Sequence, residues 1–307
     1  MARFPSCILA TCVVPWGDRY EFQENLFRHQ VRTLLRDGTR HLYIFGTAGE
    51  GYAVTNRQFQ EIVQVFCAEM RSGGAEPMVG VISTSLPSVI ERLEMAHDLG
   101  VRQFQISLPC WGALADAEVA TFFRETCRRF PDSQFLHYNL LRTKRIITAK
   151  EYARLAGEHE NLVATKNSTD SMERIHALLT QVPQLRHFLT ETGFIYGSLL
   201  GECGLLISLA SSNWQSARQF FDAGQRQDAA ALIANQRELN AMLHEVIATV
   251  GGGVEHIDGT FDKVLWRLHD RQFPLRLLPP YEGATAEAFE KYQAFLLERH
   301  PRWLPPE

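Results

Sequence analysis

The sequence lacks a surplus of basic residues and has no long apolar stretch. Its 31 Lys and Arg stand against 35 Asp and Glu, a formal net charge of −4, so the basic footprint of a nucleic-acid or anionic-membrane binder is missing. No apolar run reaches the ~20 residues of a membrane span. The apolar N-terminal stretch is interrupted by Ser6 and Thr11, and we interpret it as a strand rather than a signal peptide. We expect a soluble, cytoplasmic protein.

Motifs for metals, disulfides and dinucleotides are also missing. The six cysteines form no CxxC pair, and the eleven histidines form no HxH or HxxxH pair. A zinc site or a disulfide framework is therefore disfavoured, and we expect no metal. No GxGxxG follows the first apolar run, which argues against a doubly wound dinucleotide-binding sheet.

The 307 residues, 45% of them hydrophobic, contain a regular alternation of two kinds of segment. Eight short β-rich runs, each nearly continuously apolar as in parallel strands covered on both faces, span residues 7–14, 41–46, 77–83, 104–109, 134–139, 162–167, 187–192 and 204–210. Amphipathic helical segments lie between them, at residues 22–35, 59–70, 89–99, 119–130, 149–156 and 172–179.

This alternation predicts an α/β fold, a (β/α)8 TIM barrel, whose usual size is ~250 residues. We assign the barrel to residues 1–224 and a C-terminal helical extension to residues 225–307. Helices are expected in the extension at residues 228–250, 260–269 and 284–299, with glycines 251–253 as a break.

Lys166 is the most informative residue, because catalytic groups of such barrels lie at the C-terminal ends of strands. It is one of five lysines and the one that lies within an apolar strand run. Burial there lowers the pKa of the amine; a drop from ~10.4 to near 7 raises its neutral fraction about a thousandfold. A neutral amine can attack a ketone and form a Schiff base, which acts as an electron sink. A lysine paired with a carboxylate, or reaching solvent, is the alternative.

Two neighbouring strand ends support a site. Tyr138 ends the preceding strand run and faces inward by the same alternation, so its phenol can donate and accept protons; core packing is the alternative. The loop at residues 46–51 (GTAGEG) offers glycine-permitted N–H groups at Gly46 and Ala48 beside the Thr47 hydroxyl, which suits a carboxylate. Glu50 is expected to be structural.

Together these pieces form a recognisable signature: GTAGE at residues 46–50, Tyr138-Asn139, and Lys166 placed 28 residues after the tyrosine. The signature resembles that of the dihydrodipicolinate synthase/N-acetylneuraminate lyase family of class I, Schiff-base aldolases. The likeness extends over nearly the whole chain.

The resemblance implies a barrel with a helical appendage that assembles as a homotetramer, a dimer of dimers, or as a homodimer. Lys166 would form the Schiff base with pyruvate or another 2-oxo acid, with no other cofactor, and Tyr138 would carry protons. Thr47 and the backbone of Ala48 would hold the substrate carboxylate, and the Ile207 carbonyl would lie near the reacting carbon.

Departures from the family pattern argue against the synthase itself. Ala48 stands where a second hydroxyl residue is usual, and Trp111 falls near the synthase tyrosine that reaches across a subunit interface. Leucines 140 and 141 replace a proline, and Arg142 matches the carboxylate-binding arginine only with a one-residue gap. We therefore expect an aldolase or dehydratase with a different partner, such as an aldehyde, in which Arg142 and Trp111 contact the variable end of the substrate.

Two other functions remain open. Ala48 and Trp111 favour a catalytically impaired member that binds a 2-oxo acid as a binding or regulatory protein. An isomerase of phosphorylated sugars is disfavoured, because residues 208–213 contain no glycine for a phosphate loop.

Overall fold

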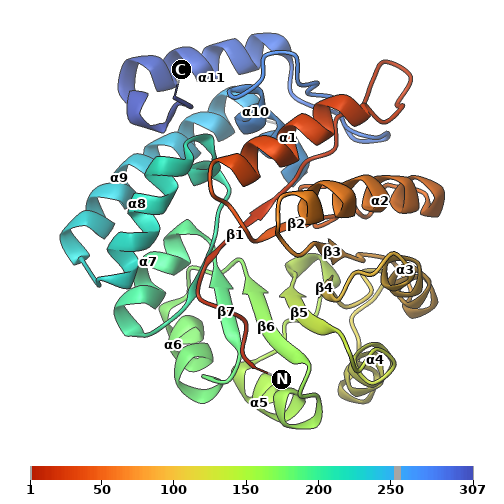
Figure 1. Ribbon diagram of the computed structural model, residues 1–307. Coiled ribbons are helices and arrows are strands. Elements are labelled where there is room, and N and C mark those ends of the chain that lie inside the picture. The colour runs from red at the N-terminus through yellow and green to blue at the C-terminus, as the bar shows by residue number, and fades with distance from the viewer. Residues whose placement is uncertain (1, 252–256, 307) are drawn as a thin grey trace.

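A closed barrel of eight parallel strands forms the centre of the molecule (Figure 1). The computed structural model describes residues 2–251 and 257–306. Each strand pairs with its neighbours in sequence, and β1 pairs with β8. The strands are β1 (Ile8–Thr11), β2 (Leu42–Ile44), β3 (Met78–Gly80), β4 (Gln103–Ile106), β5 (Gln134–Asn139), β6 (Leu162–Asn167), β7 (Arg186–Leu189) and β8 (Gly204–Leu206). The predicted (β/α)8 fold is confirmed.

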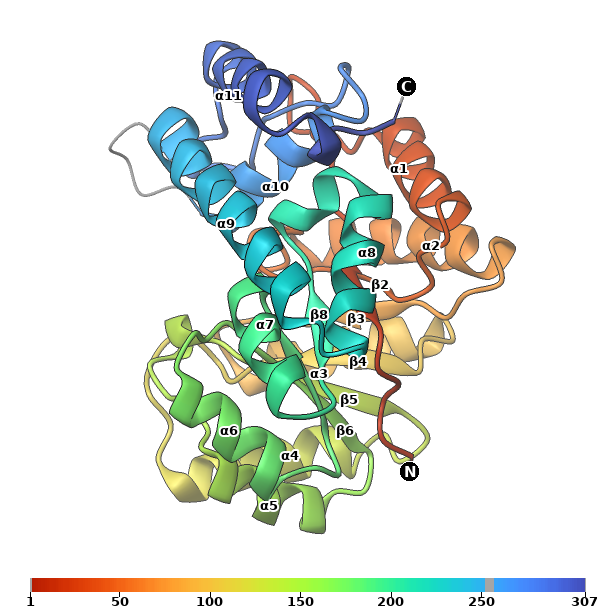
Figure 2. The same cartoon turned by 90° about the vertical axis from the view of Figure 1, so that its left-hand side faces the viewer.

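Helices surround the barrel and continue beyond it (Figures 1 and 2). Those of the barrel are α1 (Glu24–Arg36), α2 (Asn56–Ser72), α3 (Leu86–Asp98), α4 (Asp116–Cys127), α5 (Ala149–Glu158), α6 (Met172–Gln181), α7 (Glu191–Leu200) and α8 (Trp214–Gln225). The extension carries α9 (Ala229–Val246), α10 (Asp258–Arg267) and α11 (Ala286–Arg299). Short turns are η1 (Leu141–Thr143), η2 (Leu209–Ser212), η3 (Ile247–Gly251, a π turn) and η4 (Pro301–Trp303).

The sequence prediction was wrong around α7 and missed α8. The run at residues 187–192 was expected to be a strand, but β7 ends at Leu189 and α7 begins at Glu191. Because α7 is apolar and packed on several sides, it lacks the one-sided stripe that marks a surface helix. Its Gly193 permits close packing, since a Cβ there would lie 2.7 Å from the carbonyl oxygen of Thr169. The expected run at 204–210 ends as a strand at Leu206.

The extension is packed onto the barrel. In Figure 2, α10 lies between the barrel and α11. A glycine break was expected at residues 251–253. Gly251 is the last residue of η3, and glycines 252 and 253 lie outside the described residues, so the break stays a prediction. The boundary at residue 225 stays a prediction.

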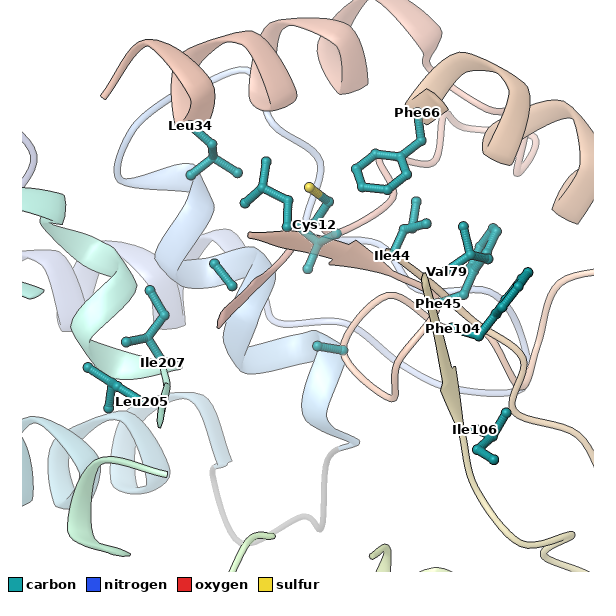
Figure 3. Close-up of a cluster of buried hydrophobic side chains, with 14 of the residues drawn as sticks. Cys12, Leu34, Ile44, Phe45, Phe66, Val79, Phe104, Ile106, Leu205 and Ile207 are labelled. Atoms are coloured by element: carbon teal, nitrogen blue, oxygen red, sulfur yellow. The ribbon is translucent and has the colours of Figure 1, made fainter. Parts of the chain in front are cut away.

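Two apolar clusters hold the barrel together. One lies between the strands and the surrounding helices, and Figure 3 shows part of it, including Cys12, Ile44, Val79 and Phe104. The other fills the barrel interior and consists of Phe4, Leu9, Tyr43, Met78, Leu136, Val163, Ala164, Phe188 and Leu206. This inner cluster forms a packed floor, which leaves the end of the barrel where the strands have their C-terminal ends for a site.

The structure also shows the state of the cysteines, of the potential metal ligands and of the longer helices. All six cysteines are free thiols. Within residues 2–251 and 257–306, no group of three or more His, Cys, Asp or Glu side chains could hold a metal ion. No helix in the described part of the chain has the length and apolar character to cross a bilayer.

Candidate active site

The alternation of side chains along β5 and β6 places Tyr138 and Lys166 above the barrel floor. Leu136 and Ala164 belong to the inner apolar cluster, and the residues two positions further on point the same way. Tyr138 pairs in register with Lys166, and both are buried, 4% and 3% exposed. The inward orientation predicted for the lysine and the tyrosine is what the structure shows.

The Lys166 amine lies between two phenol rings. Its Nζ donates a hydrogen bond to Oη of Tyr43, at 2.8 Å. The same nitrogen is 4.8 Å from the centre of the Tyr43 ring and 3.9 Å from the centre of the Tyr138 ring. Sequence reasoning missed Tyr43, although it lies in the middle of β2 and within the apolar run at residues 41–46.

Burial makes the amine a better nucleophile. It lowers the pKa of Lys166 from 10.5 to about 8, while the carboxylates of Asp258 and Asp262 oppose that shift. The lowering of the Lys166 pKa agrees with the expected effect of burial, and the two carboxylates, which were not foreseen from the sequence, limit it. At pH 7 about one amine in ten is then neutral, roughly 300-fold more than for an ordinary lysine.

The loop at residues 46–51, which we call the GTAGEG loop, is folded tightly against the barrel mouth. Phe45 and Glu50 flank its centre with positive φ angles of 64° and 57°, an unfavourable conformation that packing must maintain. Stacking of Phe45 on Phe59, with ring centres 5.0 Å apart, supplies such packing. The loop therefore holds Thr47 in a defined position.

Thr47 connects the lysine's surroundings to the extension. It is buried and forms side-chain hydrogen bonds with Tyr138 and with Asp258. Burial raises the pKa of Tyr138, as does Asp258, whereas hydrogen bonds with Ser168 and Thr47 lower it. Tyr138 is thus protonated at neutral pH and able to donate.

These residues surround a cavity of about 110 Å³ at the barrel mouth. The barrel contributes Thr11, Tyr43, Thr47, Ala48, Tyr138, Lys166, Ser168, Thr190, Leu206, Ile207 and Ser208, and α10 contributes Asp258 and Asp262. Apart from the floor and the apolar Ala48 and Ile207, the lining is made of hydroxyl groups, one amine and two carboxyl groups. Such a lining suits a small, polar, partly anionic molecule.

Helix α10 was predicted, but its part in the site was not. Asp258 and Asp262 are four residues apart and therefore share one face of the helix. The next residue, Lys263, points elsewhere and forms a fully buried ion pair with Glu50, Nζ to Oε1 2.6 Å. Burial lowers the pKa of Lys263 to about 8, and Glu50 opposes that shift. In the sequence, the four-residue spacing of Asp258 and Asp262 was the only sign that α10 contributes to the site.

Glu50 has the structural role expected of it. Besides Lys263, its carboxylate accepts hydrogen bonds from Trp16 Nε1 at 2.9 Å and from the backbone N–H of Leu278 at 2.7 Å. It thereby joins the GTAGEG loop to the N-terminal segment and to the extension.

The other predicted site residues fall at different distances from the cavity. Ala48 and Ile207 line it. Gly46 lies beside it, where a Cβ would meet the Tyr43 ring at 2.6 Å. Arg142, on η1, is at the rim, bound to Asp258. Trp111 is 84% exposed and is not among the cavity residues, so within this chain it is not brought to the site.

A closed (β/α)8 barrel with an inward lysine and tyrosine at its mouth defines the class of protein. Comparison with known families identifies it further: the model of the dihydrodipicolinate synthetase family matches residues 5–257. The chain belongs to this family of lyases, as the sequence resemblance predicted.

Individual relatives are distant. An uncharacterised DapA-like lyase of Pyrococcus abyssi is 23% identical over 94% of this chain and 96% of its own length. The 4-hydroxy-tetrahydrodipicolinate synthase of Acaryochloris marina is 27% identical over 57% of this chain and 60% of its own length.

Solved structures share the fold. YagE, a prophage protein of Escherichia coli K12 solved in complex with pyruvate, superposes with a TM-score of 0.83 at 16% identity, covering 96% of this chain and 98% of that one. The N-acetylneuraminate lyase of Fusobacterium nucleatum gives 0.81 at 16% identity, covering 97% and 98%.

Proposed function

We propose that this protein is a Schiff-base-forming lyase, an aldolase or a dehydratase, acting on pyruvate or another 2-oxo acid. The observation that carries the proposal is the position of the Lys166 amine, buried in the cavity with Nζ 3.9 Å from the centre of the Tyr138 ring. Burial lowers the pKa of this amine to about 8, so a useful fraction is neutral and nucleophilic at physiological pH.

In the proposed reaction, Nζ attacks the C2 carbonyl carbon of the 2-oxo acid, and the carbonyl oxygen leaves as water. In an aldol cleavage, the resulting iminium accepts the electron pair of the carbon–carbon bond that breaks, and the product is an enamine. In a dehydration, it accepts the electron pair of the C3–H bond when that proton is removed, and the enamine then expels the neighbouring hydroxyl group as water, whose oxygen keeps the electron pair of the broken carbon–oxygen bond. Tyr138 supplies and removes protons, and Thr47 with the Ala48 backbone holds the carboxylate. Because the iminium is the electron sink, we expect no metal or organic cofactor.

The test is reduction with borohydride in the presence of pyruvate, followed by mass spectrometry of peptides. We expect a reduced pyruvate adduct on Lys166 and none in a Lys166→Ala variant. If pyruvate and several other 2-oxo acids leave Lys166 unmodified, the mechanism is wrong.

A 2-oxo acid binding or regulatory protein is the second candidate, favoured by the absence of a hydroxyl at Ala48 in the cavity lining. It predicts binding of pyruvate without exchange of its methyl protons in deuterated water. Exchange that disappears in Lys166→Ala would exclude it. In either case we infer assembly as a homotetramer or homodimer, which light scattering after size-exclusion chromatography measures.

A further inference from the structure

The rim of the cavity carries a paired cation. The Arg142 guanidinium binds Asp258 through two hydrogen bonds, Nη1 to Oδ2 at 3.2 Å and Nη2 to Oδ1 at 2.9 Å. Parallel hydrogen bonds of this kind are the strongest arrangement for an arginine and a carboxylate. Burial opposes ionisation of Asp258, but hydrogen bonds from Arg142 and Thr47 outweigh it and hold its pKa below the ordinary value. Both groups are charged, and their charges cancel.

Helix α10 is fixed where it makes this pair. A Cβ at Gly259 would lie 2.9 Å from the carbonyl oxygen of Ala48, so glycine is what allows the helix to approach the GTAGEG loop so closely. Four residues further on, and so on the same face of the helix, Lys263 is anchored by its buried ion pair with Glu50. Asp258 is therefore held beside Arg142 by the packing of the helix as a whole.

In the part of the cavity formed by the described residues, no other cation is free for a second acidic group. Among the residues that line it, Lys166 is the one Lys or Arg, and its amine is used when the Schiff base forms. Towards α10, the substrate would meet the carboxyl groups of Asp258 and Asp262. Asp258, whose charge is balanced by Arg142, offers a second carboxylate no unpaired cation. Burial raises the pKa of Asp262 to about 8, so its carboxyl group is largely protonated at neutral pH and can donate a hydrogen bond to a substrate hydroxyl group or accept one from it.

We propose that Asp258 is a specificity-determining residue: by occupying Arg142 it excludes 2-oxo acids with a second carboxylate, and with Asp262 it selects those whose far end carries hydroxyl groups. This inference rests on the proposed Schiff-base function and adds a substrate class to it. The selecting groups come from the C-terminal extension rather than from the barrel.

The test compares three five-carbon 2-oxo acids by the rate of borohydride trapping on Lys166: 2-oxoglutarate, 2-oxopentanoate and 4,5-dihydroxy-2-oxopentanoate. The first two differ only in the second carboxylate, and the third adds hydroxyl groups. In the wild-type protein we expect the dihydroxy acid to be trapped fastest and 2-oxoglutarate slowest. Trapping reports on binding and imine formation, so it does not require turnover.

Asp258→Asn removes the negative charge that balances Arg142 and one of its two acceptor oxygens. We expect the ratio of 2-oxoglutarate to 2-oxopentanoate trapping to rise about tenfold or more, as for a charge-assisted hydrogen bond gained. The gain should vanish in Asp258→Asn/Arg142→Gln. Arg142→Gln alone leaves Asp258 unpaired and should lower the ratio below the wild-type value, which provides a test in the opposite direction.

Each failure has its own signature. An unchanged ratio in Asp258→Asn, or a gain that persists without Arg142, overturns the inference. So does a dihydroxy acid trapped no faster than 2-oxopentanoate in the wild-type protein. If pyruvate leaves no adduct on wild-type Lys166, the proposed function itself fails, whereas normal pyruvate trapping with unchanged ratios refutes the specificity role alone. Pyruvate trapping in each variant also shows that its site is folded.

Discussion

The amine of Lys166 on β6 donates a hydrogen bond to the phenol oxygen of Tyr43 on β2, at 2.8 Å, across the inside of the barrel. Both side chains are buried, 3% and 2% exposed, so this bond is not shared with bulk water. The pair fixes the direction of the amine relative to the cavity. In the proposed mechanism, Tyr43 would therefore position the nucleophile.

Replacement of Tyr43 by phenylalanine keeps the ring and removes the acceptor. The amine then samples other directions, and we expect imine formation with pyruvate, measured by borohydride trapping, to slow by about tenfold, the equivalent of ~1.4 kcal/mol. Tyr152→Phe is the matched control: this buried phenol bonds His137, at 2.6 Å, outside the cavity, and its trapping rate should match the wild type. If Tyr43→Phe is trapped at the wild-type rate, Tyr43 does not position the amine.

The pH dependence of imine formation should follow the lysine. The pKa of Lys166 is lowered to about 8, and the neutral amine is the reactive form, so the trapping rate should rise with pH and level off above about 8. Burial raises the pKa of Asp262 to about 8, and in its ionised form this carboxyl group raises the pKa of Lys166. Asp262→Asn removes that ionised form and should therefore move the midpoint to lower pH. Asp222→Asn, an exposed change on α8, should leave it in place. A midpoint insensitive to Asp262 would contradict the electrostatic coupling.

The buried pair of Lys263 and Glu50 should matter for stability. Lys263→Met leaves the Glu50 carboxylate without its cation at a site where both side chains are 0% exposed, and we expect a loss of about 3–5 kcal/mol in the free energy of unfolding by urea. The double variant Lys263→Met/Glu50→Gln should recover part of the loss. Lys291→Met breaks an exposed ion pair with Glu287 and should barely change the unfolding midpoint. Equal effects at positions 263 and 291 would refute this prediction.

Two buried histidines should make the fold acid-sensitive. Burial lowers the pKa of His137 to about 3 and that of His187 to about 4, from 6.5. The unfolded chain binds these protons first, so stability falls as the pH drops below 6.5, by about 1.4 kcal/mol per pH unit for each histidine. Urea unfolding at pH 7.5, 6 and 5 measures this. His137→Gln should make the unfolding free energy less dependent on pH, whereas His29→Gln, an exposed change, should not. If the two variants show the same dependence on pH, buried His137 is not a cause of the acid sensitivity.

Periodicity made the barrel predictable. Continuous apolar runs alternating with amphipathic segments allow few other arrangements, because a parallel strand must be covered on both faces. The same periodicity located Lys166 and Tyr138, since side chains two residues apart on a strand face the same way. It failed at α7, where an apolar helix buried on several sides has no period to detect.

The sequence by itself therefore determined the strand order, the inward lysine and tyrosine, and the family. Only the tertiary structure decided what surrounds the amine: Tyr43, 123 residues away in the chain, and the aspartates of α10. Local patterns record which face of an element is apolar, but they do not record which distant element will pack there. The partners of Lys166 depend on closure of the barrel and on the docking of the extension against the GTAGEG loop, both of which are long-range packing events.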